Sequence, residues 1–321
     1  MANAKRGAEI LDVTTRKAKP RPLPIGETAL ELIERNLPEP IKQCDPWAVE
    51  GLNLIAGRPK LGKTTLERQK LAAMAEGVSF FGSPCERCTG LFLSLEEGER
   101  LTRQKFIKAD FPMAALERIR VFYEWPRGEE GVKRLAQYLA ENPEVRFTVI
   151  DSLTKFRAVP DKQTPAFVAD YESVSMLHGA LKDLPGVCID LVHHTRKMKS
   201  DDPIDDISGT YGLSAAVDSY MVLRHHEDGA VMHAGGRLWD RDVSEYKLRR
   251  GNQRWELVGE HTGLTGEQER THHDLKQNGG ITAPQLASKL GIHRQSAWER
   301  LNALVDKGMA YKKDGVFHAS R

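Results

Sequence analysis

The chain has 321 residues, of which 40% are hydrophobic and 29% are charged, a balance typical of globular proteins and compatible with more than one domain. Its formal net charge is only +2, so any surface for nucleic acid would have to be local. Polar residues interrupt the apolar stretches within a few positions, which argues against a membrane-spanning helix, and 4 cysteines are too few for a disulfide scaffold and favour a reduced, cytoplasmic protein.

The N-terminal region is rich in lysine, arginine and proline and shows little apolar periodicity, so we interpret residues 1–25 as a flexible basic arm. This arm contains no apolar segment of the kind found in a secretory signal. A short amphipathic helix is expected next, from Ala29 to Asn36.

Short apolar runs alternate with longer helical stretches between Trp47 and Gly259. The runs that predict strands are Leu52–Ala56, Gly90–Leu95, Ile119–Phe122, Phe147–Ile150, Val187–Val192 and Tyr220–Leu223. The stretches that predict helices are Lys63–Glu76, Glu99–Ala109, Gly131–Glu141 and Phe167–Leu184. This alternation indicates an α/β fold with a mostly parallel sheet, and we assign residues 26–260 to it. The period-two pattern from Val231 to Val258 predicts a terminal antiparallel hairpin.

A linker around Gly263 and Gly266 precedes a smaller domain, which we assign to residues 264–321. Its pattern predicts short helices, a third helix from His293 to Lys307, and a hairpin around the Asp314-Gly315 turn.

Cys85 and Cys88 have the spacing of half a zinc site. No second Cys/His pair of matching type lies nearby in the sequence, so a surface hairpin is the simpler interpretation.

The strongest motif is a match to G-x-x-x-x-G-K-[ST] between the first predicted strand and the first predicted long helix. It comprises Gly57, Arg58, Pro59, Lys60, Leu61, Gly62, Lys63 and Thr64, and Thr65 follows it. Such a loop cradles phosphates with its backbone N–H groups, while Lys63 reaches the β- and γ-phosphates and Thr64 ligates Mg²⁺. A chance match in a turn is the alternative. Glu67, Arg68 and Lys70, further along the helix, are expected to face solvent or a neighbouring subunit.

Two predicted strands end in carboxylates. Asp151 follows the strand 147–150, at the edge where ligands bind in open α/β sheets, and we expect it to hold the magnesium ion through water. An N-cap is its simpler role. Glu96 and Glu97 follow the strand 90–95 and are candidates for the general base, with Glu96 preferred, although a solvated pair at a helix start would look the same.

A third strand ends in His193 and His194, either of which could hydrogen-bond to a γ-phosphate and report its hydrolysis. We prefer His194. The polar loop that follows contains Arg196, Lys197 and Lys199 together with several aspartates.

The order of these motifs resembles the hexameric RecA-like ATPases of the RepA type, which are plasmid replicative helicases found also in phages and mobile elements. The matching segments are Gly57–Thr64, Leu93–Glu97, Val149–Ser152, His193–Lys197, Gly209–Asp218, Gly236–Val243 and Trp255, and they span roughly two thirds of the chain, from Pro38 to Gly259. The resemblance implies a base at Glu96 or Glu97, with ATP and Mg²⁺ as cofactors.

The same resemblance implies a ring, a hexamer in that family, in which ATP lies between subunits and a neighbour supplies an arginine finger. Arg241 is the first candidate for that finger and Arg237 the second, although both could be surface arginines of a strand. It also implies that Arg196, Lys197 and Lys199 face DNA in the channel of the ring, although the nearby aspartates oppose contact with phosphates.

The C-terminal pattern resembles a winged helix-turn-helix. Arg294 and Arg300 on the recognition helix and Lys312 and Lys313 on the wing are candidates for DNA contact. Docking of a partner protein is the alternative use of such a module.

These patterns together predict an ATP-hydrolysing DNA helicase or translocase that acts as a ring in the replication of mobile DNA. Two other functions fit the same motifs. One is a DNA-binding ATPase switch that regulates or loads other proteins without unwinding, and the other is a recombinase-like filament former.

Overall fold

The computed structural model describes residues 26–35, 37–159, 165–182, 184–196, 200–207, 211–239, 245–260 and 266–320. The chain divides into two compact units, Met1–Glu39 and Pro40–Arg321. In the first unit, α1 (Ala29–Glu34) begins with a capping box between Thr28 and Glu31, and it buries no residue. The basic arm lies outside the described residues. No helix in the described ranges is long and apolar enough to cross a bilayer.

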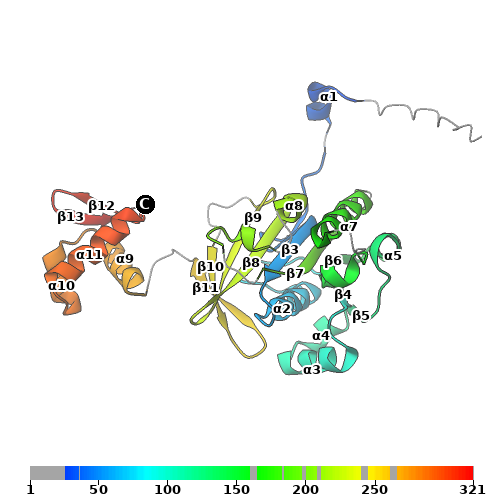
Figure 1. Ribbon diagram of the computed structural model, residues 1–321, viewed down its shortest axis with the longest axis horizontal. Coiled ribbons are helices and arrows are strands. Elements are labelled where there is room, and N and C mark those ends of the chain that lie inside the picture. Colours follow the sequence, from blue (N-terminus) through cyan, green and yellow to red (C-terminus); the bar gives the residue numbers. More distant parts are fainter. Residues whose placement is uncertain are drawn as a thin grey trace, which may run out of the picture. The chain divides into compact units, whose positions relative to one another are not determined.

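A nine-stranded sheet forms the centre of the second unit, in the order β11-β10-β9-β8-β3-β7-β6-β4-β5 (Figure 1). The strands that make parallel pairs are β3 (Gly51–Gly57), β4 (Thr89–Ser94), β5 (Ile119–Phe122), β6 (Val145–Asp151), β7 (Cys188–His194) and β8 (Ser219–His226). Antiparallel strands β9 (Gly229–Gly236), β10 (Glu245–Arg250) and β11 (Trp255–Glu260) extend the sheet beyond β8. The predicted α/β class with a mostly parallel sheet is therefore confirmed.

Helices follow most of the parallel strands. They are α2 (Lys63–Glu76), α3 (Glu99–Ala109), α4 (Met113–Leu116), α5 (Gly128–Glu141), α6 (Leu153–Phe156), α7 (Ala166–Leu181), α8 (Tyr211–Ala216) and the 3-10 turn η1 (Ile204–Asp206). The sequence pattern gave the bounds of α2 and α3 correctly. It started α5 at Gly131, three residues late, and ended α7 at Leu184, three residues late, because helix ends depend on local capping more than on periodicity.

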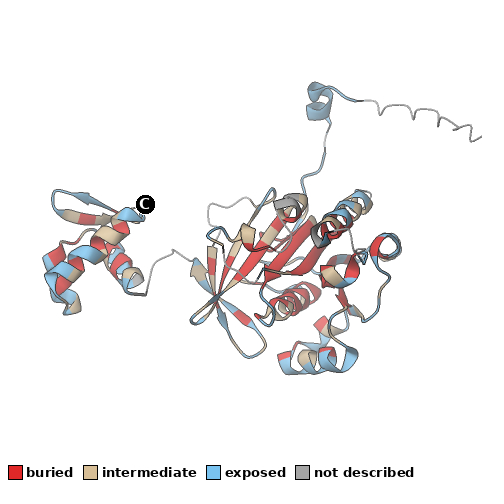
Figure 2. Cartoon of the chain, in the orientation of Figure 1, coloured by how far each residue is buried: buried red, intermediate tan, exposed pale blue. Residues whose placement is uncertain are grey.

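Successive residues of each central strand pack on opposite faces of the sheet, as the pleat requires. In β4, Phe92 belongs to the core cluster that includes Leu71 and Met74 of α2. Its neighbours Leu91 and Leu93 belong to the other cluster, which includes residues of α5 and α7. Both faces are therefore covered, and most residues of the central strands are buried (Figure 2). Burial of both faces explains why these strands are continuous apolar runs in the sequence.

Two features of the sheet region differ from the sequence-based expectation. The terminal antiparallel hairpin is present, but it forms part of a longer antiparallel arrangement that begins with β8 pairing to β9. A small hairpin of β1 (Lys42–Cys44) and β2 (Ala48–Val49) was not predicted at all. Strands of three and two residues are too short to show periodicity.

The C-terminal part has its own core, formed by residues between Leu275 and Ala319. Its elements are α9 (Gly266–Asn278), α10 (Ala283–Leu290), α11 (Arg294–Asp306), β12 (Ala310–Lys313) and β13 (Val316–Ala319). Thr282 and Gln285 form a capping box at the start of α10, and Gly291 ends it in the left-handed conformation. Asp314 and Gly315 both have positive φ, as the predicted two-residue hairpin turn requires. The expected winged helix-turn-helix is therefore confirmed.

Candidate nucleotide-binding site

The phosphate-binding motif forms the loop between β3 and α2, as expected. Gly62 precedes the first turn of α2 with φ 106°, a conformation that favours glycine. Among the residues that the structure describes, no side chain caps the start of α2, so the first N–H groups of this helix remain available to an anion. The Nζ of Lys63 donates to the carbonyl oxygens of Gly57, at 2.7 Å, and Arg58, at 3.1 Å. The Lys63 side chain thus folds back over the loop that would bind a phosphate group.

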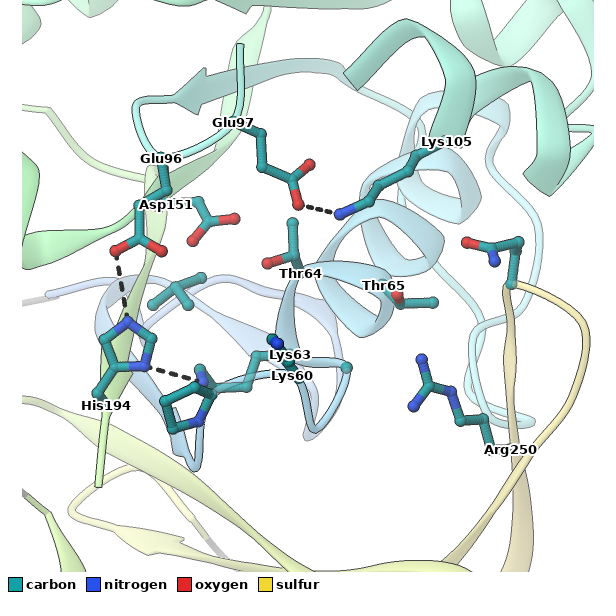
Figure 3. A pocket seen from close by; sticks show the side chains of 14 residues that line it. Lys60, Lys63, Thr64, Thr65, Glu96, Glu97, Lys105, Asp151, His194 and Arg250 are labelled. Atoms are coloured by element: carbon teal, nitrogen blue, oxygen red, sulfur yellow. Dashed lines mark hydrogen bonds and ion pairs between the residues drawn. The ribbon is translucent and has the colours of Figure 1, made fainter. Parts of the chain in front are cut away.

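The loop opens into a cavity of about 400 Å³ at the carboxyl ends of the parallel strands (Figure 3). Most of the residues proposed from sequence for the nucleotide site lie around it. The lining comprises Pro59, Lys60, Gly62, Lys63, Thr64, Thr65, Glu96, Glu97, Lys105, Asp151, Val192, His194, Arg250 and Gln253. Leu61 is largely buried in the core, at 9% exposure, while the carbonyl oxygens of Gly57 and Arg58 accept hydrogen bonds from Lys63.

Asp151 ends β6 and is 2% exposed. Burial raises the pKa of its carboxyl to about 6, and a hydrogen bond from Thr64 acts in the opposite direction. A hydroxyl beside a carboxylate at the phosphate loop suits Mg²⁺, which takes one or two protein oxygens and fills its remaining positions with phosphate and water. No cluster of three or more His, Cys, Asp or Glu that could hold a metal occurs in the ranges that the structure describes. Thr64 and Asp151 are the residues whose oxygen atoms could hold the ion together with a nucleotide.

Glu96 lies beyond the end of β4, where its backbone N–H donates to the carbonyl oxygen of Asp151 at 3.1 Å. Its Oε1 accepts a hydrogen bond from the Ser152 hydroxyl at 2.5 Å and lies 3.4 Å from Nε2 of His194. The hydrogen bond with His194, followed by that with Ser152, lowers the pKa of Glu96 to about 2 against the opposing effect of burial. Glu96 is therefore an oriented, ionised carboxylate at neutral pH.

Glu97 has a different environment. One of its carboxylate oxygens pairs with Arg68 of α2 and the other with Lys105 of α3. Two cations thus neutralise Glu97, whereas Glu96 is hydrogen-bonded by a hydroxyl and an imidazole. Of the two glutamates, Glu97 is therefore held by arginine and lysine, and Glu96 is the one held by hydrogen bonds from Ser152 and His194.

Glu67, Arg68 and Lys70 of α2 are buried, so the expectation that they face solvent or a neighbouring subunit is wrong. Arg68 is 3% exposed and reaches Glu97. Lys70 is fully buried and pairs with Glu67, at 3.2 Å, and with Asp190 of β7. A buried charge persists only where it is paired, and Asp190 and Glu97, which pair with Lys70 and Arg68, lie outside α2. Nothing in the helix sequence shows that pairing.

His194 connects the lysine and the glutamate. Its Nδ1 lies 3.3 Å from Nζ of Lys63 and its Nε2 lies 3.4 Å from Glu96, as the dashed lines of Figure 3 show. His193 is 3% exposed and lies 4.0 Å from Asp170 of α7. Because side chains alternate along a strand, His194 shares the cavity lining with Val192 and His193 does not.

Trp255, at the start of β11, braces the phosphate loop, and no local pattern in the sequence predicts this contact. The indole N–H of Trp255 donates to the carbonyl oxygen of Gly62 at 3.1 Å. The backbone of Trp255 exchanges two hydrogen bonds with the Gln69 side chain, at 2.8 and 3.0 Å. A Cβ on Gly62 would lie 2.9 Å from the indole, so glycine is needed there for close packing as well as for its φ. Arg250 lines the cavity and lies over the same indole at 5.9 Å.

Lys63 gives the site a testable pH dependence. Burial lowers the pKa of its ammonium group to about 8, although Asp151 and Glu96 act to raise it. Below this pH, Lys63 of the nucleotide-free site is a cation that can bind phosphate. Above this pH, Lys63 is a neutral amine that must gain a proton before it can do so. We therefore expect ATP affinity to fall as pH rises through 8, by up to about tenfold for each pH unit. Fluorescence titration with a non-hydrolysable ATP analogue would measure this, and an affinity that stays constant across pH 8 would contradict it.

The candidate DNA-contacting residues lie in different settings. Arg294 opens α11 and is exposed, as are Lys312 and Lys313 on β12. Arg300 is half-buried, and its guanidinium pairs with Glu267 of α9 at 2.8 Å. Of the two recognition-helix arginines, Arg294 is therefore the one presented to solvent.

Several other proposed residues lie at or beyond the limits of the described ranges. Arg241, Lys197 and Lys199 are outside them. Arg196 is exposed, and its backbone N–H donates to the carbonyl oxygen of Asp206. Arg237 is exposed and lines a second surface pocket with residues of α7.

Two known protein families match parts of this chain. The AAA domain family matches residues 19–200, and the chain belongs to this family. A winged helix-turn-helix DNA-binding family matches residues 275–309. With its phosphate loop and this fold, the protein is a P-loop ATPase that carries a C-terminal winged helix-turn-helix.

No curated protein matches the chain. Among solved structures, a DnaB-like replicative helicase described with its interactions with primase is similar at 16% identity and a TM-score of 0.51, over 64% of this chain and 58% of that one. The KaiC-like protein PH0186 from Pyrococcus horikoshii OT3 is similar at 16% identity and a TM-score of 0.46, over 65% of this chain and 89% of that one. At such identity the likeness to the DnaB-like helicase shows a shared fold.

Proposed function

We propose that this protein is an ATP-driven DNA motor, a helicase or translocase, which assembles as a ring. The observation that carries the proposal is the cavity, where a phosphate-loop lysine, a Thr–Asp pair suited to Mg²⁺ and an ionised glutamate converge. The winged helix-turn-helix adds a module of DNA-binding type. The fold shared with a DnaB-like replicative helicase supports the motor assignment.

The chain's own residues supply the parts that hydrolysis needs. The N–H groups of the loop and of the start of α2 bind the phosphates, and Lys63 neutralises charge that develops on the transferred phosphoryl group. Thr64 and Asp151 would hold Mg²⁺, Asp151 through water, and the ion would neutralise charge on the phosphates. Glu96 orients the attacking water and accepts its proton.

His194 gives the site a means of sensing the nucleotide. In the structure it lies within hydrogen-bonding distance of both Lys63 and Glu96. A γ-phosphate that draws Lys63 toward itself competes with the Lys63–His194 contact, so His194 and Glu96 can rearrange together. This would couple the presence of the γ-phosphate to the position of the base.

The ring and its arginine finger follow from the resemblance to RepA-type helicases. Arg241 is the proposed finger, with Arg237 as the alternative, and each subunit would complete the site of its neighbour. The role in replication of plasmid or phage DNA rests on the same resemblance alone.

The wing lysines allow a test of the winged helix. Each phosphate contact releases about one counterion, so Lys312→Gln/Lys313→Gln should reduce the salt slope of duplex binding by roughly one to two units. Basal ATP hydrolysis should not change, because neither lysine lines the nucleotide cavity. Lys133→Gln on α5, another exposed lysine, is the matched control. Equal slopes for the wing variant and the wild type would reassign this module to docking a partner protein.

A strand-displacement assay tests the motor function. The wild type should separate a forked duplex only with ATP and Mg²⁺, and single-stranded DNA should stimulate its hydrolysis. Slow hydrolysis without displacement, in a protein that still binds DNA, would favour the ATPase switch instead. Strand exchange between homologous DNAs would favour the filament former.

A further inference from the structure

Two cysteines from distant parts of the sequence meet beside α2. Cys44 ends β1, and Cys85 lies in the segment between α2 and β4. Their sulfur atoms are 2.9 Å apart. Both thiols also lie near the carbonyl oxygen of Ser83, at 3.8 Å for Cys44 and 3.9 Å for Cys85.

The backbone holds the two segments together at this point. The N–H of Glu86 donates to the carbonyl oxygen of Gln43 at 2.7 Å, so the residues next to each cysteine are directly hydrogen-bonded. Ser83 is fixed by a reciprocal pair of backbone hydrogen bonds with Phe80, at 2.9 and 3.0 Å. A disulfide requires closely spaced backbones with the two side chains directed at each other, and this arrangement supplies both.

The pair is chemically asymmetric. Cys44 is fully buried, whereas Cys85 is partly exposed. The thiol of Cys44 donates to the Cys85 sulfur when that sulfur is a thiolate, which lowers the pKa of Cys85, and Lys70 acts in the same direction. The same contact and burial raise the pKa of Cys44. An external reagent therefore reaches the sulfur of Cys85 first, whereas the sulfur of Cys44 is shielded from it.

We propose that Cys44 and Cys85 are a redox-modification site. The two cysteines form a reversible disulfide with each other by exchange with small-molecule disulfides of the glutathione type. The Cys85 thiolate attacks one sulfur of the reagent, which forms a mixed disulfide and releases one thiolate. Cys44 then loses its proton and attacks the Cys85 sulfur, which releases the second. The two protein thiols give up two electrons and two protons, and the reagent leaves as two thiols.

The other cysteines are poorly placed for this reaction. Cys188 is fully buried in β7, where the Asn53 amide donates to its sulfur, and burial raises its pKa well above the usual range. Cys88 is 6% exposed, and burial raises its pKa to about 11. The site is therefore specific for the Cys44–Cys85 pair, although Cys85 and Cys88 are closer in sequence.

Oxidation should also stabilise the fold. The disulfide would close a loop that contains the phosphate loop and all of α2, which reduces the entropy of the unfolded chain. We expect the melting temperature of the oxidised protein to exceed that of the reduced protein by roughly 5 °C or more.

The full-length protein treated with glutathione disulfide provides the test. The expected product loses about 2 Da and keeps no glutathione adduct, and dithiothreitol reverses the change. Trypsin cleaves after Arg87, between Cys85 and Cys88, so the cross-linked peptides identify the partners. The expected link joins the peptide Gln43–Lys60 to the peptide Leu71–Arg87.

Two variants make the outcome decisive. Cys88→Ser should form the same link with the same rise in melting temperature. Cys44→Ser should instead stop at a glutathione adduct on Cys85, because the second sulfur is missing. A wild-type protein that keeps its thiols free, that stops at an adduct, or that links Cys85 to Cys88 would overturn the proposal.

Discussion

Glu96→Gln should lower kcat for ATP hydrolysis by about 10²- to 10⁴-fold while ATP affinity stays close to that of the wild type. The amide keeps the shape of the side chain, and its oxygen can still accept the Ser152 hydrogen bond that Glu96 accepts in the structure. It cannot accept a proton from water. Steady-state hydrolysis and equilibrium binding of a fluorescent ATP analogue, measured on the same preparation, separate the two effects.

Glu97→Gln is the matched control, because the two glutamates are adjacent and both line the cavity. Glu97 pairs with Arg68 and Lys105, so its loss should mainly weaken the packing between α2 and α3. We expect a lower melting temperature and a much smaller loss of turnover. If Glu97→Gln abolished hydrolysis and Glu96→Gln kept it, the base would be Glu97.

Lys63→Ala should reduce ATP turnover by at least about 10²- to 10³-fold, because it removes the cation that faces the transferred phosphoryl group. ATP affinity should fall as well, since the charge also contacts the bound ground state. Lys63 is 5% exposed and donates to two loop carbonyls, so the melting temperature of the variant must be measured alongside its activity.

Lys60→Ala offers a control within the same loop. Lys60 is exposed and also lines the cavity, whereas Lys63 is 5% exposed and donates to two carbonyl oxygens of the loop. Its replacement should leave most of the turnover. Equal losses for the two variants would mean that the loop binds nucleotide through general positive charge and that Lys63 has no special role.

The sequence predicted the central sheet and the phosphate loop well because each has a local signature. The buried strands are apolar runs of the right length, and α2 begins at the lysine of the motif. The placement of Glu96, Asp151 and His194 around one cavity also followed, because the carboxyl ends of parallel strands meet at one edge of a sheet. Alternation along β7 explains why the preferred His194 lines the cavity and His193 does not, since Val192 and His194 share a face.

What the sequence did not predict depends on contacts between distant segments. Trp255 braces Gly62 across 193 positions. Lys70 of α2 was expected to face solvent or a neighbouring subunit, yet its partner Asp190 lies on β7 and allows full burial. Arg300 was expected to face DNA, and its pairing with Glu267 became visible only once α9 and α11 were packed. In each case the residue type is compatible with several environments, and the fold selects one.

Electron microscopy of Glu96→Gln with ATP, Mg²⁺ and forked DNA can show the assembly and the nucleotide together, because this variant should hold an intact nucleotide. We expect a closed ring with ATP in the cavity, Lys63 against its β- and γ-phosphates, and Thr64 and Asp151 at the magnesium ion. A cavity without nucleotide would contradict the site. An open filament or an isolated dimer, with nucleotide bound, would contradict the ring motor.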